Sequence, residues 1–105
     1  AKTKTRKDKP ETPQYFTLLQ NYPNPFNAST KISFKLEKNG YVELKIYDLL
    51  GNTVRTLHEG VKEANTYEFY WDGTDFKSIT APSGIYFVRL SFNGSVQTKK
   101  MILVK

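Results

Sequence analysis

The sequence predicts an all-β fold, an immunoglobulin-like antiparallel β-sandwich of about seven strands. Several segments alternate apolar and polar residues with a period of two, which is typical of strands with one buried face. These segments are short and are separated by turns rich in Gly, Asn and Pro. Aromatic residues make up 14% of the chain and can fill a core between two sheets. About 90 residues are enough to close one such core.

The chain divides into a short tail and one domain. Residues 1–14 hold no aromatic or large aliphatic side chain and are expected to form a flexible basic linker. Five basic side chains against two acidic ones give this tail a charge of +3, half of the net +6. Residues 15–105 form the domain, whose eleven basic and eight acidic side chains do not predict a nucleic-acid interface. The chain does not begin with Met, so it is interpreted as a piece of a longer protein.

A proline-rich turn precedes the first long strand. Each proline restricts the residue before it to extended conformations, so no helix can cross this stretch. The asparagines have short amides that can bond nearby backbone groups. The aromatic side chains of Tyr22 and Phe26 are expected to be buried where the turn folds back onto the core. The stretch consists of Asn21, Tyr22, Pro23, Asn24, Pro25, Phe26 and Asn27.

The first three strands are expected over residues 15–19, 30–36 and 41–47. In the second and third, every other side chain is Ile, Phe, Leu or Val, and the side chains between them can face solvent. Asn39-Gly40 lies between these two strands and predicts a hairpin turn, because both residue types reach the positive φ that such a turn needs.

The fourth strand is expected over residues 53–59 and the fifth over residues 66–71. Val54 and Leu57 break strict alternation in the fourth strand, which predicts a β-bulge or a sheet edge. Residues 60–65 are expected to connect the two strands. In the fifth strand the alternating residues that face the core are Tyr67, Phe69 and Trp71.

The last two strands are expected over residues 85–92 and 95–104. A tight turn at Asp72-Gly73 and a loop through Gly84 precede them, and Asn93-Gly94 predicts the hairpin that joins them. Trp71 and Tyr86 are expected in the core.

Catalysis finds little support in the residue types present. The chain has no cysteine, which excludes disulfides, thiolate metal sites and a cysteine nucleophile. His58 is the only histidine and is interpreted as an exposed strand residue. Asp72 and Asp75 could form a weak Ca²⁺ site, but we favour side chains that cap turn amides, because calcium needs six to eight oxygens. The domain is therefore expected to be no enzyme and to hold no cofactor or metal. No run reaches the ~18 apolar residues of a membrane span.

Two other functions remain open at this point. Outward aromatic rings could hold a glycan, as in an accessory carbohydrate-binding module, although such rings more often form cross-strand pairs. The candidates are Tyr41, Tyr47, Tyr70 and Phe87. A spacer module of a multidomain extracellular hydrolase would use the same core residues.

The closing segment is apolar and has lysines on both sides. It is either a last strand whose edge the lysines protect, or a terminal address that a receptor reads by pairing with that edge. The segment consists of Lys99, Lys100, Met101, Ile102, Leu103, Val104 and Lys105.

These motifs together resemble the type A carboxy-terminal sorting domain of the type IX secretion system. That family overlaps with immunoglobulin-like domains related to the flagellar hook-capping protein. The resemblance covers about residues 15–105. The sequence departs from the family pattern in three places. Ala28 stands where a further proline is usual, and Asn65 stands where glycine is usual. The loop of residues 76–79 has no glycine. The motif residues that the resemblance rests on are Asn21, Tyr22, Pro23, Asn24, Pro25, Phe26, Asn27, Trp71, Asp72, Gly73, Gly84 and Tyr86.

The resemblance implies a non-catalytic C-terminal sorting signal that directs an exported protein across the outer membrane. Its implied partners are the type IX secretion machinery, a sortase-like peptidase and an upstream cargo domain in the same chain. The implied location is the periplasm in transit, then the medium or the cell surface. Recognition is expected at residues 99–105 together with the folded face.

Overall fold

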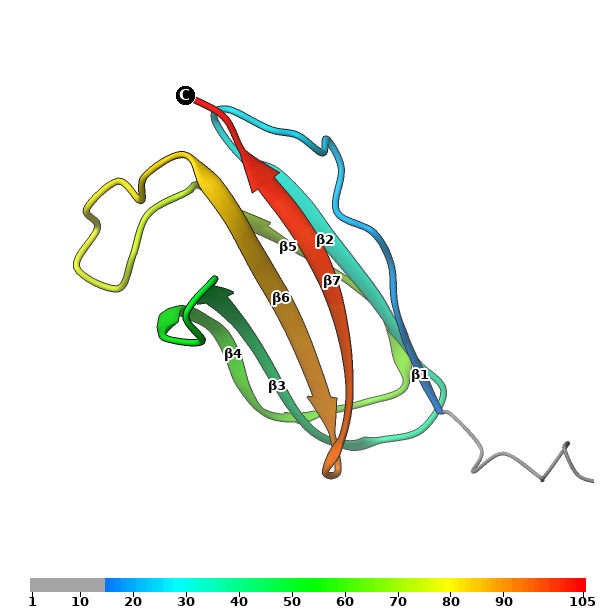
Figure 1. The fold of residues 1–105 in the computed structure, drawn as a ribbon. Helices are drawn as coiled ribbons and strands as arrows, with labels where there is room; N and C mark the ends of the chain where they lie inside the picture. Colours follow the sequence, from blue (N-terminus) through cyan, green and yellow to red (C-terminus); the bar gives the residue numbers. More distant parts are fainter. Residues whose placement is uncertain (1–14) are drawn as a thin grey trace, which may run out of the picture.

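The computed structural model describes residues 15–105 and confirms the all-β sandwich (Figure 1). Seven antiparallel strands form two sheets. The predicted linker of residues 1–14 lies outside the described residues. The strands are β1 (Phe16–Leu18), β2 (Thr30–Leu36), β3 (Gly40–Asp48), β4 (Thr53–Lys62), β5 (Asn65–Trp71), β6 (Gly84–Phe92) and β7 (Ser95–Leu103).

The two sheets have the orders β1-β2-β5 and β4-β3-β6-β7. Three connections join strands of the same sheet, namely β1–β2, β3–β4 and β6–β7. The connections β2–β3, β4–β5 and β5–β6 each carry the chain from one sheet to the other. Each sheet therefore contains one pair of neighbouring strands that are distant in the sequence, β2–β5 in one sheet and β3–β6 in the other, as in other β-sandwiches.

The hairpin predicted at Asn39-Gly40 is wrong, because this segment crosses between the sheets. Asn39 accepts a hydrogen bond from the Ala64 amide at 2.8 Å and so ties this crossing to the β4–β5 crossing. Gly40 is needed for space, since a Cβ there would lie 2.6 Å from the Phe92 ring. The Asn-Gly pair thus serves a close approach between elements rather than a tight turn.

The second Asn-Gly hairpin is confirmed between β6 and β7. Asn93 and Gly94 have φ values of 49° and 93°, the two positive angles of this turn. The Asn93 amide also donates to the Tyr41 carbonyl, and its side-chain oxygen accepts from the Tyr41 amide at 2.9 Å. The hairpin tip is thereby joined to the start of β3.

β4 confirms both features predicted from its broken alternation. It is an edge strand, and its register with β3 shifts between Leu44 and Lys45 and again between Ile46 and Tyr47. The predicted connection over residues 60–65 is too long, because β4 stays paired with β3 up to Lys62.

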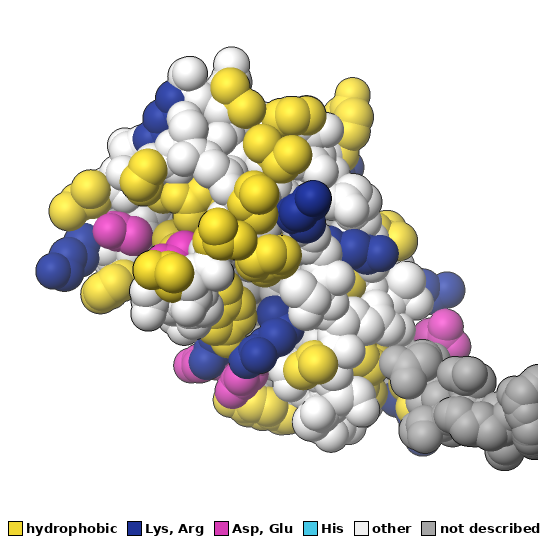
Figure 2. All heavy atoms as spheres, in the orientation of Figure 1, with side chains coloured by type: hydrophobic (Ala, Val, Ile, Leu, Met, Phe, Trp, Pro, Cys, Tyr) yellow, Lys and Arg dark blue, Asp and Glu magenta, His cyan; other side chains and the backbone are white. Residues whose placement is uncertain are grey.

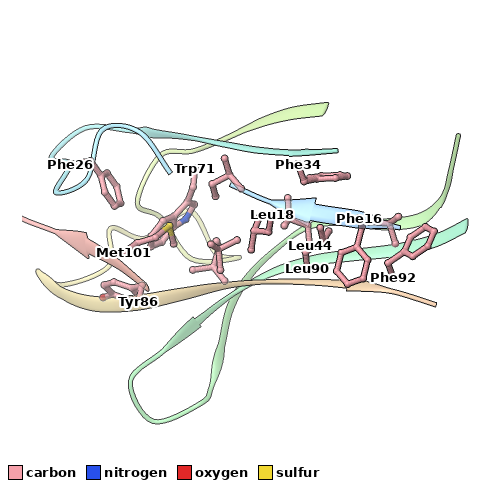
Figure 3. Packing of buried hydrophobic residues seen from close by; sticks show 14 of the residues in the cluster. Phe16, Leu18, Phe26, Phe34, Leu44, Trp71, Tyr86, Leu90, Phe92 and Met101 are labelled. Carbon is pink, nitrogen blue, oxygen red and sulfur yellow. The ribbon is translucent and has the colours of Figure 1, made fainter. Parts of the chain in front are cut away.

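The core lies between the sheets and is closed at one end by three aromatic rings (Figure 3). Trp71 and Tyr86 are buried, as predicted, with ring centroids 5.3 Å apart and nearly perpendicular planes. Phe26 also packs against Trp71, with ring centroids 5.6 Å apart. Aromatic pairs in such arrangements add about 0.5–1.5 kcal/mol beyond the area that they bury.

The side of the sandwich between β4 and β5 is less closed. Tyr67 and Phe69, expected in the core, are only half-buried, and the Lys62 ammonium lies 4.4 Å above the Tyr67 ring. The expectation that His58 is exposed is wrong. It is half-buried, its ring lies 5.8 Å from that of Phe69, and its Nε2 atom is buried without a hydrogen-bond partner among the described residues.

Within residues 15–105 no helix is long and apolar enough to cross a membrane. The same part of the chain holds no group of three or more His, Cys, Asp or Glu that could bind a metal ion.

The close approach of Gly40 to the Phe92 ring, where the chain passes from β2 to β3, can be tested by substitution. Gly40→Ala should lower the free energy of unfolding by about 1–3 kcal/mol, because the new Cβ would overpack the buried Phe92 ring. Urea unfolding measures the change, with Thr98→Ala, at an exposed position of β7, as control. A Gly40→Ala variant as stable as the control would contradict the close approach.

Candidate functional site

The proline-rich turn lies against the free edge of β7. The Phe26 amide donates to the Ile102 carbonyl at 3.0 Å, and the Val104 amide donates to the Phe26 carbonyl at 2.9 Å. Phe26 is thus paired in parallel with Leu103. The Ile102 amide donates to the Asn24 side-chain oxygen at 2.9 Å. Both proline peptide bonds in this turn are cis.

A buried set of polar groups holds this turn in shape. The Asn21 side chain is 2% exposed, and its amide donates to the Thr30 hydroxyl at 2.8 Å and to the Pro23 carbonyl at 3.1 Å. The Thr30 hydroxyl in turn donates to the Pro23 carbonyl at 2.8 Å. The Asn21 oxygen accepts from Gln20, so both ends of the buried amide have partners.

Of the two aromatic residues expected to be buried in the turn, only Phe26 is. Tyr22 is 75% exposed. Its backbone amide and carbonyl both bond Lys31 and so extend the pairing of β2. This pairing turns the Tyr22 side chain to solvent and leaves Asn21 as the buried neighbour.

Two glutamines continue the closure of the β7 edge. Gln20 donates to the Lys100 carbonyl at 2.8 Å. Gln97 accepts from the Leu18 amide at 2.8 Å and donates to the Phe16 carbonyl at 2.9 Å, which joins β7 to β1 across the two sheets. The idea that a receptor pairs with the β7 edge is therefore wrong for residues 100–104, because segment 20–26 already occupies those backbone groups.

The predicted recognition residues do not all face solvent. Met101 and Leu103 are buried core residues. Lys99 and Ile102 are half-buried. The side chains that are exposed are those of Lys100, Val104 and Lys105.

The tryptophan turn supports the closing segment from a second direction. Trp71 Nε1 donates to the Thr74 carbonyl at 2.8 Å, and Asp72 accepts from both the amide and the hydroxyl of Thr74. A Cβ at Gly73 would lie 3.7 Å from the Leu103 side chain, so the turn contacts the end of β7. Asp75 accepts from the amides of Lys77 and Ile79. The turn-capping interpretation of both aspartates is confirmed.

The hydroxyl of Thr74 holds the pKa of Asp72 below its ordinary value. Partial burial of the carboxyl opposes this effect, while the Thr74 amide and the Arg55 guanidinium add to it. Arg55 also donates to the Thr74 hydroxyl at 2.7 Å and to the Asp75 carbonyl at 3.1 Å. The carboxylate therefore serves the turn and shows no raised pKa of the kind that a general acid needs.

The start of β6 supports the closing segment from a third direction. The Lys105 amide donates to the Ser83 hydroxyl at 2.9 Å, and Gly84 pairs with Leu103. The Tyr86 hydroxyl donates to the Pro82 carbonyl at 2.6 Å, and burial raises the pKa of Tyr86, with a further contribution from Asp48. Three motifs that are distant in the sequence thus meet at residues 101–105.

The outward aromatic residues do not form one platform. Tyr41 and Tyr47 lie on β3, and Phe87 pairs with Tyr47 in the same sheet. Tyr70 belongs to the other sheet. The Arg89 guanidinium covers the Tyr47 ring, 4.7 Å from its centroid, and donates to its hydroxyl. Tyr41, Tyr47 and Phe87 thus share one sheet, and the four candidate rings cannot form a single glycan-binding face.

A family model described as the secretion system C-terminal sorting domain matches residues 20–105. The chain belongs to this family. The domains of the family are sorting signals for type IX secretion and are not catalytic. The chain is therefore a sorting domain of an exported protein that reaches the cell surface or the medium.

Solved structures show the same fold. The latent dimeric PorU of Porphyromonas gingivalis is 24% identical, with a TM-score of 0.70, over 95% of this chain and 10% of PorU. PorZ of P. gingivalis, a bacterial surface component of the type IX system, is 20% identical, with a TM-score of 0.57, over 86% of this chain and 11% of PorZ. FlgD of P. aeruginosa is 27% identical, with a TM-score of 0.52, over 71% of this chain and 60% of FlgD.

This chain thus spans about one tenth of the length of PorU and PorZ. A search among curated protein sequences found no match.

Sequence reasoning missed three residues that shape the site. Gln20 and Gln97 bond backbone groups across the edge of β7, and no local pattern distinguishes them from surface glutamines. Ser78 has φ 64° and makes the left-handed turn in a loop that has no glycine. Its place three residues after Asp75, which caps the loop, is the signal that could have found it.

The bond between Asn24 and Ile102 should stabilise the closing segment. Asn24→Ala removes the acceptor of the Ile102 amide, so the free energy of unfolding should fall by about 1 kcal/mol and the Ile102 amide should exchange faster. Hydrogen exchange by NMR measures this change. The control is Asn27→Ala, an exposed residue of the same turn whose side chain bonds no described residue. Equal protection of Ile102 in both variants would contradict the role of Asn24.

The lowered pKa of Asp72 predicts a pH dependence. An aspartate whose folded pKa lies below the unfolded value of about 3.9 stabilises the fold above that pH, and the effect disappears as the pH falls through the folded pKa. Asp72→Asn should therefore lower the melting temperature at pH 6 and have a smaller effect at pH 2. Comparing the melting temperatures of the parent and the variant at the same pH removes the contribution of the other carboxyl groups, which is the same in both proteins. A difference that does not change with pH would contradict the prediction.

Proposed function

We propose that residues 99–105, together with the folded face around them, form the part of this sorting domain that the type IX machinery recognises. The observation that carries the proposal is the convergence of three motifs on the end of β7. The proline-rich turn, the tryptophan turn and the start of β6 each contact residues 101–105. Exposed side chains on this segment, among them Lys100 and Lys105, are thus presented in one geometry.

The proposal extends to the partners of the domain. A folded address at the end of a longer chain would carry an upstream cargo domain through the periplasm, and residues 1–14 would connect the two. A sortase-like peptidase would then act at the cell surface. Similarity to domains of PorU and PorZ supports an association with this system, and PorZ is a surface component of it.

The alternative functions have less support. A carbohydrate-binding module needs rings on one accessible face, and the four aromatic candidates are divided between two sheets. A spacer would need the same core, but it would not need the closing segment to be held by three separate motifs.

An export assay tests the proposal. The full chain is fused to a periplasmic reporter in a host that has the type IX machinery. The intact fusion should reach the cell surface or the medium. The double variant Lys100→Ala, Lys105→Ala should reduce export at least tenfold, because it removes two exposed cations without changing the core.

The matched control is the double variant Lys35→Ala, Lys38→Ala, which removes the same charge from exposed positions elsewhere in the domain. All variants must keep the melting temperature of the parent. If the intact fusion stays in the periplasm, the sorting proposal is wrong for this domain. If both double variants are exported like the parent, the signal lies elsewhere on the sandwich and the assignment of residues 99–105 fails.

A further inference from the structure

The excess of basic side chains in the domain comes from its last third. Residues 15–75 hold six basic and eight acidic side chains, whereas residues 76–105 hold five basic ones and no acidic one. Such segregation creates a field of one sign over part of a surface, which attracts groups of the opposite sign. The basic residues of the last third are Lys77, Arg89, Lys99, Lys100 and Lys105.

The fold places two of these cations on the outer face of β6 and β7. The buried residue Val88 separates Phe87 from Arg89 along β6, so the side chains of both neighbours point away from the core. Lys100 pairs with Phe87 and lies on the same face. Figure 2 shows Lys and Arg side chains over this part of the molecule. We call the surface formed by Phe87, Arg89, Thr98 and Lys100 the cationic face.

The domain itself does not neutralise these two cations. None of the ion pairs within residues 15–105 includes Arg89 or Lys100. The carboxylates on the same side of the sheet belong to Glu43 and Glu59, and both lie beside Lys45, at 3.7 and 3.5 Å. Lys45 lies directly opposite Arg89. Like charges directly opposite destabilise a sheet, so folding alone would favour a neutral or acidic residue at position 89.

The Arg89 side chain is held in one orientation. Its guanidinium lies 4.7 Å from the centroid of the Tyr47 ring and donates a hydrogen bond to the Tyr47 hydroxyl at 2.7 Å. Its other N–H groups have no acceptor among residues 15–105. A stacked guanidinium with free donors can bind a carboxylate through two parallel hydrogen bonds.

The spacing of the two cations indicates which anions fit them. Arg89 pairs with Thr98, and Lys100 is two residues further along β7, so the two positions are diagonal neighbours about 7–8 Å apart. Two residues of an extended strand advance about 7 Å, so carboxylates at alternate positions of a strand have nearly the same separation. The two cations therefore match two carboxylates on one side of a partner's segment.

We propose that the cationic face binds a partner protein through an acidic surface whose carboxylates are fixed about 7 Å apart. One carboxylate would bind the Arg89 guanidinium, and the other would lie beside the Lys100 ammonium. The inference rests on the proposed function in one respect, because Lys100 also belongs to the segment of residues 99–105.

Other occupants match the cationic face less well. Residues 1–14 carry a charge of +3. An ordered guanidinium favours a partner whose carboxylates are also ordered, as on a folded protein, over mobile lipid headgroups. In a second copy of the domain, six of the eight carboxylates of residues 15–105 are already beside a basic side chain or bonded to turn amides. These six belong to Glu43, Asp48, Glu59, Glu68, Asp72 and Asp75.

Charge reversal separates this binding from folding. Arg89→Glu places a carboxylate opposite Lys45, so the melting temperature should not fall, whereas export in the assay described above should fall at least threefold. Arg89→Glu with Lys100→Glu should reduce export at least tenfold. The matched control, Lys35→Glu with Lys38→Glu, makes the same change of charge at exposed positions elsewhere and should be exported like the parent. An equal loss of export in this control would contradict the proposal.

A photo-crosslinking amino acid at position 98, beside both cations, identifies the occupant in the same cells, and position 66 on the other sheet serves for comparison. Mass spectrometry should find position 98 joined to a segment of another protein in which acidic residues outnumber basic ones. The Arg89→Glu, Lys100→Glu variant should lose this crosslink. A crosslink to lipid or to a second copy would overturn the proposal, as would the absence of any crosslink specific to position 98.

The two proposals fail in different ways. A parent fusion that stays in the periplasm contradicts the sorting proposal, and the crosslink at position 98 then still decides whether the cationic face binds an acidic segment. If Lys100→Ala with Lys105→Ala blocks export while Arg89→Glu is exported like the parent, the cationic face alone is wrong.

Discussion

The pairing of Phe26 with the end of β7 is the contact on which the C-terminal half of the site depends. Its two backbone hydrogen bonds and the Asn24 side chain occupy polar groups that an edge strand would otherwise expose. The Phe26 ring also packs beside Trp71. One short turn therefore provides hydrogen-bond partners for the edge of β7 and closes one end of the core. The buried amide of Asn21 holds that turn in place.

This arrangement makes the two sides of the sandwich unequal. On the β1–β7 side, Gln97 bonds the backbone of β1 and the proline-rich turn covers the rest of β7. On the β4–β5 side, Tyr67 and Phe69 remain half-buried, and Lys62 covers part of their rings. Closure is concentrated where the closing segment lies.

The sequence predicts the seven strands well because alternation reports burial directly, as in β2, where Ile32 and Phe34 are fully buried. The prediction from sequence fails where the same short motif can arise for two different structural reasons. Asn93-Gly94 makes a turn, whereas Asn39-Gly40 makes room for Phe92. In the site, the resemblance identified the motif residues, but their meeting at residues 101–105 depends on contacts between distant segments. No periodicity encodes such contacts, and Tyr22 and His58 were misplaced for the same reason.

The β3–β4 turn and the β5–β6 loop expose large apolar side chains that would ordinarily be buried. Leu49, Leu50, Phe76 and Ile79 would contribute more to stability in the core, yet capped turns keep them in solvent. Places where a chain departs from the rule of buried apolar residues are commonly functional. The edge of β7 that the three motifs hold is thus satisfied, whereas the apolar side chains of the β3–β4 turn and the β5–β6 loop remain in solvent.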